Sequence, residues 1–339
     1  MNTAKQPGKP MARRTAKRLL GGFTQLVVLC ILFGFVAVFT NQNAASQEIQ
    51  PPLPDQLVGG SFTYVVQKGD SLTSIGARFA VGVNALAASN RISVNAILRE
   101  GRSLLIDNRH IVPDVVSEGF LINIPQRMLF FFQQGQPARA YPVALGRPSW
   151  PTPTGTFKVV IKEENPVWEV PKSIQEEMRR EGKFVEERVP PCPENPLGKH
   201  WLGLSIPGLG VHGTIAPASI YAFQTHGCIR LNPDDIAEIF AEVGRGTPGQ
   251  IIYKRLMIAR LGERIFLEVH RDIYGKEPDP LASLIAVAKA KNLDVALDWE
   301  LAKAIIAKQE GIAREVTRKA AYTNDHEPKQ PRSASPAER

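Results

Sequence analysis

Residues 225–231 read THGCIRL, and residues 212–214, which precede them, read HGT. Cys228 lies in the middle of the first motif, fourteen residues after the end of the second. Asn232 and Pro233 come directly afterwards, and Asn is a favoured cap for a helix whose first turn accepts Pro. The pattern therefore predicts a cysteine placed immediately before a helix N-terminus.

These residue types suit a nucleophilic cysteine. A thiolate is a strong nucleophile, and its pKa falls when an imidazolium, a guanidinium or a helix N-terminus lies near it. His226, Arg230 and His212 offer such groups, so we expect Cys228 to have a depressed pKa. Taken singly, each residue has a simpler interpretation, because a lone Cys is more often a small buried hydrophobe and a lone His a satisfied core residue.

The surrounding segments predict a β-rich domain. Short apolar runs separated by turn residues begin at Gly119 and continue up to the THGCIRL motif. We expect helices at residues 173–182, with its charges on the outer face, and directly after Asn232. Residues 190–198 (PPCPENPLG) hold four prolines in nine positions, which is typical of a loop. The prediction is a mostly β domain with few helices over residues 118–254.

A smaller unit precedes this domain. Residues 62–106 begin with an alternating strand pattern and a turn, continue with two short helices, and end with a strand at residues 104–106. The first helix starts after Ser71, which can cap it. We therefore predict a βααβ unit over residues 61–107.

The two motifs together resemble the L,D-transpeptidase catalytic domain (YkuD family). Further segments agree with the same family: TPTGTF at 152–157, NPVW at 165–168, PENPLG at 193–198 and GVHGT at 210–214. The resemblance implies a YkuD-like β-sandwich with few helices. One departure is Cys192, where family members usually carry Gly, and a second thiol there raises the question of redox control or an altered loop shape.

The same resemblance implies roles for individual residues. The family's nucleophile corresponds to Cys228, and the histidine that pairs with the thiol corresponds to His212, oriented by the backbone carbonyl of Gly213. His226, Gly227 and Arg230 correspond to positions that shape the pocket. Backbone N–H groups around Gly227 and Cys228 would stabilise the tetrahedral oxyanion.

The βααβ unit resembles the LysM domain. It reads Y-x-V-x-x-G-D-S-L-x-x-I over residues 64–75 and G-x-x-L-x-I over residues 101–106. The resemblance implies binding of N-acetylglucosamine-containing glycans in a shallow groove between two loops. Its candidate residues are Gly69, Asp70, Ser71, Leu72, Asn95 and Ile97. The simpler interpretation is that Gly69, Asp70 and Asn90 are turn and cap residues that a small fold needs.

The implied reaction is acyl transfer in two steps, with neither cofactor nor metal. The thiolate attacks the carbonyl of the diamino acid in a peptidoglycan tetrapeptide stem, expels D-alanine and leaves a thioester. An amine then resolves the thioester, which gives a 3→3 cross-link or attaches a lysine-bearing lipoprotein. The expected partners are peptidoglycan stem peptides and glycan strands, and hydrolysis of the same stem by an L,D-carboxypeptidase is the alternative.

Two interpretations outside this enzyme class are also open. Cys192, His212, His226 and Cys228 could form a Cys2His2 zinc site, although His226 and Cys228 are separated by one residue where zinc pairs usually have two to four. A catalytically silent wall-binding protein would use the LysM unit alone, and the pairing of His212 with Cys228 would then have no purpose.

The N-terminal residues predict a membrane anchor. Residues 1–18 hold six basic residues and no acidic one, and residues 19–39 form a stretch of 21 residues without a charge. Such a stretch just spans a bilayer core of about 30 Å, and its basic flank stays in the cytoplasm. The expected location is the cell envelope, with a single-pass inner-membrane anchor and a periplasmic catalytic domain. A cleaved signal peptide is the alternative.

The remaining segments complete the predicted organisation. Residues 40–60, rich in Pro and polar residues, form a linker, and residues 255–320 a strand with a helical extension. We interpret that extension as a lid or packing element, with a partner-binding site as the alternative. Residues 321–339 have a composition typical of a disordered tail.

Composition narrows the function classes. The 339 residues leave room for about two folded units, and 43% hydrophobic and 22% charged residues exclude a wholly disordered chain and a multispan transporter. The net charge of +8 could indicate a nucleic-acid partner. Because topology explains the basic N-terminal run, we expect no nucleic acid, and the remaining positive charge would favour an anionic polymer.

Overall fold

The computed structural model describes residues 54–319. The predicted basic segment at residues 1–18, the apolar span at residues 19–39 and the tail at residues 321–339 lie outside the described residues. Within residues 54–319, no helix has the length and apolar character that crossing a bilayer requires.

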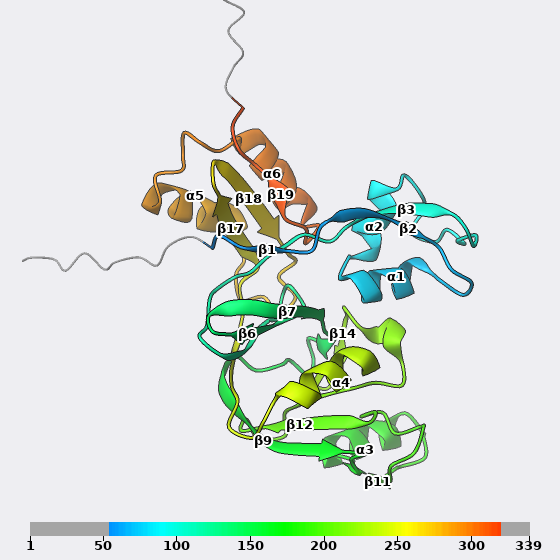
Figure 1. The fold of residues 1–339 in the computed structure, drawn as a ribbon. Coiled ribbons are helices and arrows are strands. Elements are labelled where there is room, and N and C mark those ends of the chain that lie inside the picture. Colours follow the sequence, from blue (N-terminus) through cyan, green and yellow to red (C-terminus); the bar gives the residue numbers. More distant parts are fainter. Residues whose placement is uncertain (1–53, 320–339) are drawn as a thin grey trace, which may run out of the picture. The chain divides into compact units, whose positions relative to one another are not determined.

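An eight-stranded mixed sheet forms the centre of the β-rich region (Figure 1). Its strands follow the order β15-β13-β12-β9-β16-β5-β6-β7. The pairings of β13 with β15 and of β16 with β5 are parallel, and the other five are antiparallel. The strands are β5 (Gly119–Asn123), β6 (Met128–Gln133), β7 (Gln136–Pro142), β9 (Gly155–Glu164), β12 (His200–Leu204), β13 (Gly210–His212), β15 (Ile229–Arg230) and β16 (Pro248–Ile252). The expectation of a mostly β domain with few helices is confirmed.

The core of this region lies against the sheet and helix α4 (Pro233–Glu242). Asn232 caps α4 by accepting a hydrogen bond from the Asp234 N–H at 3.3 Å, and Pro233 occupies its first turn, as the sequence predicts. The helix buries Ile236 and Ile239. They join a cluster that includes Phe120, Leu129, Tyr141, Leu202, Val211, Ile229, Leu231 and Val243. Burial of these apolar side chains is the main term that fixes the strands in place.

Shorter elements surround the sheet. Strand β8 (Leu145–Gly146) pairs with β14 (Phe223–Thr225), and β10 (Trp168–Glu169) pairs with β11 (Arg188–Val189). Helix α3 (Lys172–Arg180) lies in the sequence between β10 and β11, and a single 3-10 turn covers Pro217–Ser219.

The N-terminal unit has the predicted βααβ order. It consists of β2 (Ser61–Val65), α1 (Leu72–Phe79), α2 (Val83–Ser89) and β3 (Ser103–Asp107). Ser71 caps α1 through a reciprocal pair of hydrogen bonds with Ser74. Asn90 joins α2 to β3, since its amide donates to the carbonyls of Leu86 and Leu105 at 2.9 and 2.8 Å. Two further strands, β1 (Leu57–Val58) and β4 (His110–Ile111), pair with each other, so part of the predicted linker is a strand.

The C-terminal extension contains more strand than the sequence predicts. Strands β17 (Leu256–Leu261), β18 (Arg264–Val269) and β19 (Arg314–Glu315) form a sheet that packs with α5 (Pro280–Ala290) and α6 (Trp299–Lys308). The sequence predicts the two helices and β18 alone. β19 depends on long-range pairing with β18, which local pattern does not report. β17 and β18 form a hairpin with a tight turn between Leu261 and Arg264, and of this hairpin the sequence predicts only the second strand.

A buried polar network centres on Glu268 of β18. His110 Nδ1 and His270 Nε2 lie 2.8 and 2.7 Å from Glu268 Oε1, and the Ile111 N–H donates to Oε2 at 2.6 Å. Gln126 Nε2 donates to the same carboxylate at 3.1 Å. Burial opposes ionisation of Glu268, yet the charge and hydrogen bond of His110, together with His270, hold its pKa at about 2. The Glu268 carboxylate thus connects three elements, which are strand β4, the loop that follows β5, and its own strand β18.

We expect Glu268→Gln to lower the free energy of unfolding by about 3–5 kcal/mol, because it breaks a fully buried ionic network. Glu268 stabilises the fold above its ordinary pKa of 4.5, and this contribution is lost as the pH falls toward 2. Glu268→Gln lacks this contribution at every pH. The free energies of unfolding of the wild type and the variant should therefore converge as the pH falls.

Urea denaturation between pH 3 and 8 measures both quantities. Glu263→Gln is the control, because the Glu263 side chain is 96% exposed and its loss should cost less than about 0.5 kcal/mol. Equal losses in the two variants would contradict the role of the network.

Candidate active site

The pairing of β13 with β15 gathers the predicted site residues. The two strands run parallel, with Val211 opposite Ile229 and His212 opposite Arg230. Side chains alternate between the faces of a strand, so Cys228 shares a face with Arg230 and therefore with His212. Val211 and Ile229, on the opposite face, are fully buried in the core. The register thus brings Cys228, His212 and Arg230 to one surface of the sheet.

His212 is enclosed on the sheet surface. Its Nδ1 donates to the Gly213 carbonyl at 2.7 Å, which leaves Nε2 as the nitrogen able to accept a proton. The Trp201 ring lies beside the imidazole, with 5.8 Å between centroids. A Cβ on Gly210 would lie 2.2 Å from that indole, so Gly is required at this place in the GVHGT motif. Burial lowers the pKa of His212 to about 3, with help from the Arg230 charge, so the ring is neutral at pH 7.

Cys228 is a neutral thiol in this state, and the prediction of a depressed pKa is wrong. Burial raises the pKa of its thiol above the ordinary 9.0, and a hydrogen bond from Gly210 and the charge of Arg230 oppose this effect without overcoming it. Sγ donates to the Gly208 carbonyl at 3.7 Å, and no hydrogen bond joins it to His212. The sequence pattern places positive groups near the thiol but does not report the burial of the thiol, and burial outweighs them here.

The turn that carries Cys228 is held by hydroxyl groups. Thr152 Oγ1 donates to the Gly227 carbonyl at 2.7 Å, and Thr225 Oγ1 donates to the Cys228 carbonyl at 2.6 Å. Gly227 has φ +107°, a conformation that side chains rarely allow. The Gly227 N–H already donates to Thr225 Oγ1 at 3.2 Å. The THGC motif is therefore a compact turn that displays the thiol.

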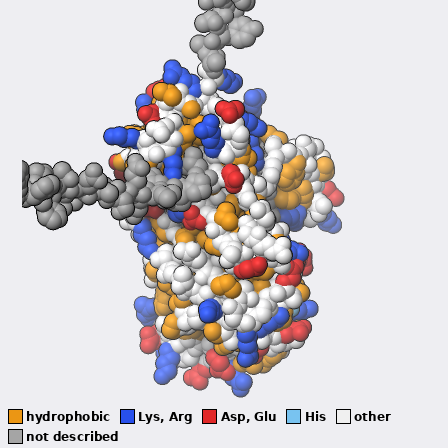
Figure 2. Space-filling model, turned by 60° about the vertical axis from the view of Figure 1, so that its left-hand side comes forward, with side chains coloured by type: hydrophobic (Ala, Val, Ile, Leu, Met, Phe, Trp, Pro, Cys, Tyr) orange, Lys and Arg blue, Asp and Glu red, His pale blue; other side chains and the backbone are white. Residues whose placement is uncertain are grey.

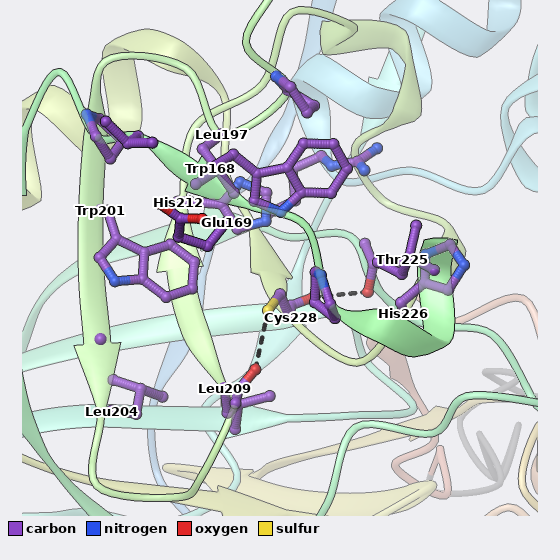
Figure 3. Close-up of a pocket in the computed structure, with 18 of the residues that line it drawn as sticks. Trp168, Glu169, Leu197, Trp201, Leu204, Leu209, His212, Thr225, His226 and Cys228 are labelled. Carbon is purple, nitrogen blue, oxygen red and sulfur yellow. Dashed lines mark hydrogen bonds between the residues drawn. The ribbon is translucent and has the colours of Figure 1, made fainter. Parts of the chain in front are cut away.

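Cys228 and His212 open into a pocket of about 710 Å³. Figure 3 shows His212 and Trp201 on one side of the Cys228 sulfur and His226 on the other side of the turn. The pocket wall includes apolar groups, among them Ile161, Trp168, Leu197, Trp201, Leu204 and Leu209, and charged groups, among them Arg147, Glu177 and Arg230. Such a volume suits a peptide segment of a few residues.

One group in this pocket does not follow from the sequence. The sequence predicts that helix α3 carries its charges outward, but Glu177 turns inward and its carboxylate contacts His226 Nε2 and Arg147 Nη2. The Trp150 ring packs edge-on against His226 at 5.1 Å. No local signal distinguishes Glu177 from the neighbouring Glu176, which is exposed.

Arg230 lies on the pocket wall without a carboxylate partner. Its Nη1 donates to Ser219 Oγ at 2.9 Å, and its buried Nε has no hydrogen-bond partner. Burial lowers the pKa of this guanidinium, and the Cys228 sulfur is the group that acts on it in the opposite direction. Arg230 is thus the positively charged group that acts on the Cys228 thiol and lowers its pKa.

The PENPLG loop is built around Asn195. Its amide donates to the Pro166 carbonyl at 2.9 Å, and its Oδ1 accepts from the Leu197 N–H at 3.0 Å. Cys192 is exposed in the same loop. The interpretation as a zinc site fails, because Cys192, His212, His226 and Cys228 do not converge. Among residues 54–319, the side chains close enough to share an ion are His110, Glu268 and His270.

In the LysM-like unit, the first candidate loop mainly supports the fold. Asp70 accepts hydrogen bonds from the Tyr64 hydroxyl at 2.5 Å and from the Gln67 N–H at 2.9 Å. Ser71 is the cap of α1, and Leu72 is buried in the core, so the Leu72 side chain is not available to a ligand.

The remaining candidates of that unit are open to solvent. Gly69 has φ +88° in the turn before α1, where a positive φ favours glycine. Asn95 is exposed, and the Ile97 side chain is 93% exposed. These residues can meet a glycan without rearrangement of the core.

The fold and the pocket are those of a cysteine-dependent acyltransferase. Residues 117–251 match the L,D-transpeptidase catalytic domain (YkuD), and residues 64–107 match the LysM domain. The chain belongs to the L,D-transpeptidase family and is an L,D-transpeptidase that acts on peptidoglycan. Both resemblances seen in the sequence are confirmed.

Two relatives carry the family assignment. The chain is 31% identical over 248 residues to the probable L,D-transpeptidase ErfK/SrfK of Salmonella typhimurium, across 70% of this chain and 79% of the relative. It is 32% identical over 238 residues to the probable L,D-transpeptidase YcfS of Escherichia coli, across 68% and 74%. A solved L,D-transpeptidase from Mycobacterium smegmatis is 19% identical, with a TM-score of 0.33 over 60% of this chain and 99% of that one.

We expect the resting thiol of Cys228 to react with iodoacetamide more slowly than Cys192 at pH 7. Burial keeps Cys228 protonated, whereas Cys192 is exposed. The Cys228 rate should continue to rise above pH 9. Peptide mass spectrometry of the time course reads both sites in one sample. Faster labelling of Cys228 at pH 6 to 7 would mean that the thiol is activated before substrate arrives.

Proposed function

We propose that Cys228 is the nucleophile and His212 the general base of this L,D-transpeptidase. The observation that carries the proposal is the shared sheet face, on which a thiol and a neutral imidazole with a free Nε2 open into one pocket. Gly213 positions His212, because its carbonyl accepts a hydrogen bond from the Nδ1–H group. Because both groups are neutral, the proton leaves sulfur during attack rather than before it.

Acylation begins when the thiol leaves the Gly208 carbonyl and turns toward His212. Sulfur attacks the carbonyl of the diamino acid, and its proton passes to His212 Nε2. The imidazolium then protonates the leaving nitrogen, so D-alanine departs as a neutral amine and a thioester remains. Burial of His212 disfavours the charged imidazolium, which favours the second transfer.

The tetrahedral intermediate needs donors at its oxyanion. The Gly227 N–H is engaged with Thr225, so we assign the primary role to the Cys228 N–H, with Gly227 joining if the turn relaxes. Arg230 adds a positive charge on the same face of the sheet and favours the developing thiolate.

The acyl acceptor is an amine of a second stem, which attacks the thioester, forms a new amide and returns the proton to sulfur. A 3→3 cross-link results. Attachment to a lysine of a lipoprotein and hydrolysis by water are the competing outcomes. The predominantly apolar pocket wall around Cys228 disfavours free access of water and supports transfer over hydrolysis.

The LysM unit and residues 19–39 determine where the enzyme is held in the cell envelope. The LysM unit binds glycan strands and keeps the enzyme on the wall, with Gly69, Asn95 and Ile97 as its exposed contacts. Residues 19–39 anchor the chain in the inner membrane, with residues 54–319 in the periplasm. The charge-free length of that stretch and its basic flank support this arrangement.

The reaction is tested with tetrapeptide-bearing muropeptides and the whole protein. We expect loss of D-alanine, a thioester on the enzyme and a dimer whose mass corresponds to two stems less one D-alanine. Intact-mass spectrometry follows the enzyme, and product masses separate cross-linking from hydrolysis. Cys228→Ser should lose turnover, and Cys192→Ser should retain it. A thioester or turnover that survives in Cys228→Ser would contradict the assignment.

The two histidines should differ in their pH dependence. His212→Ala should slow acylation at neutral pH and recover part of the rate above about pH 9, where the thiol ionises by itself. His226→Ala should lose rate at every pH, because it changes the pocket rather than the proton acceptor. Stopped-flow acylation from pH 6 to 10.5 measures both. Alkaline recovery in His226→Ala and none in His212→Ala would reverse the roles.

A further inference from the structure

Glu177 is an ionised carboxylate inside the pocket. Helix α3 buries none of its residues, yet the Glu177 side chain is only 16% exposed because it turns toward the pocket. Ile174 and Met178, from the same face of the helix, also line the pocket wall. The helix therefore forms one side of the pocket and directs a carboxylate into it.

Two cationic or N–H-bearing side chains converge on this carboxylate. Arg147 Nη2 contacts Oε1 and His226 Nε2 contacts Oε2, and these two nitrogens lie 3.2 Å apart. Hydrogen bonds from His226 first and Arg147 second hold the pKa of Glu177 at about 2. Arg147 Nε is buried and has no hydrogen-bond partner. Arginine binds carboxylates best through two N–H groups, so part of the capacity of Arg147 is unused.

The two halves of this contact differ in how firmly they are held. The backbone N–H of Arg147 donates to the Thr225 carbonyl at 3.0 Å, which fixes the backbone of Arg147 to the turn that carries Cys228. His226 belongs to that turn and packs against Trp150. Glu177, in contrast, sits on a helix that buries no side chain. The backbone of Arg147 and His226 is thus tied to the Cys228 turn, whereas Glu177 comes from a helix without buried residues.

We propose that Arg147 and His226 form a subsite for a free carboxylate of the stem peptide, and that Glu177 occupies it until substrate binds. This inference rests on the proposed function, since it places the subsite beside Cys228 in the acyl-donor pocket. A substrate carboxylate replaces Glu177 in its contacts with Arg147 and His226, and it can accept a further hydrogen bond from Arg147 Nε. Glu177 then returns to solvent, so the charge of the pocket is conserved.

The exchange makes the pocket selective for charged stems. A carboxamide in place of the carboxylate lacks the negative charge, so it competes poorly with Glu177 for Arg147. A hydrogen bond between charged groups contributes enough to change an affinity roughly tenfold or more. We therefore expect wild-type enzyme to prefer one carboxylate-bearing stem over its matched amide by about that factor.

The experiment uses the full-length chain and a set of tetrapeptide stems in which each carboxylate in turn is replaced by a carboxamide. Equilibrium binding is measured on Cys228→Ser, and acylation on the chain with Cys228 intact. Arg147→Gln should remove the preference at one carboxylate, and Arg147→Lys should restore part of it. Glu177→Gln should lower KM for charged stems with little change in kcat, because the internal competitor is weakened.

Glu176→Gln is the matched control, because Glu176 is the exposed neighbour on the same helix and should behave as wild type. An unchanged carboxylate preference in Arg147→Gln would overturn the subsite, and equal slowing of all stems by Glu177→Gln would make that residue merely structural. Binding separates this result from a failure of the proposed function. Selective binding without a thioester would refute the function alone, whereas a thioester without selectivity would refute the subsite alone.

Discussion

The parallel pairing of β13 with β15 is the constraint on which the site depends. Two registered pairs decide that His212 and Arg230 share a face with Cys228, while Val211 and Ile229 enter the core. A slip of one residue would reverse every side chain of the shifted strand and bury the thiol among apolar groups. The core therefore enforces the geometry of the candidate site, because a slip of one residue would take Val211 or Ile229 out of the core.

The same burial determines the chemistry. A cysteine becomes a thiolate when nearby positive charge outweighs desolvation, and here desolvation prevails. His212 is too deeply buried to carry a charge, and His226 gives its hydrogen bond to Glu177. The result is a neutral thiol beside a neutral imidazole, and in the reaction that we propose the proton passes between them only as sulfur attacks the substrate carbonyl. Such a resting thiol is also protected from oxidants, which react with thiolates.

The sequence predicts well what local chemistry determines. The cap at Asn232, the Ser71 capping box, the βααβ order and the His212–Gly213 contact all follow from residues near one another in the chain. Prediction fails where the partner is remote. Glu177 meets His226 across 49 residues, and β19 exists through pairing with the distant β18. Burial, too, is a property of the whole fold, and it reversed the expected direction of the Cys228 pKa.

The C-terminal extension is connected to the site in a way that its sequence does not reveal. Tyr274, which follows β18, donates to the Gly146 carbonyl at 2.5 Å and accepts from the Thr152 N–H at 3.2 Å. Thr152 in turn holds the Gly227 carbonyl. Two consecutive hydrogen bonds, from Tyr274 to Thr152 and from Thr152 to Gly227, thus connect the extension to the turn that displays Cys228. Because the nucleophile that we propose must be held to within a fraction of an ångström, we infer that the extension supports that turn in addition to its own packing.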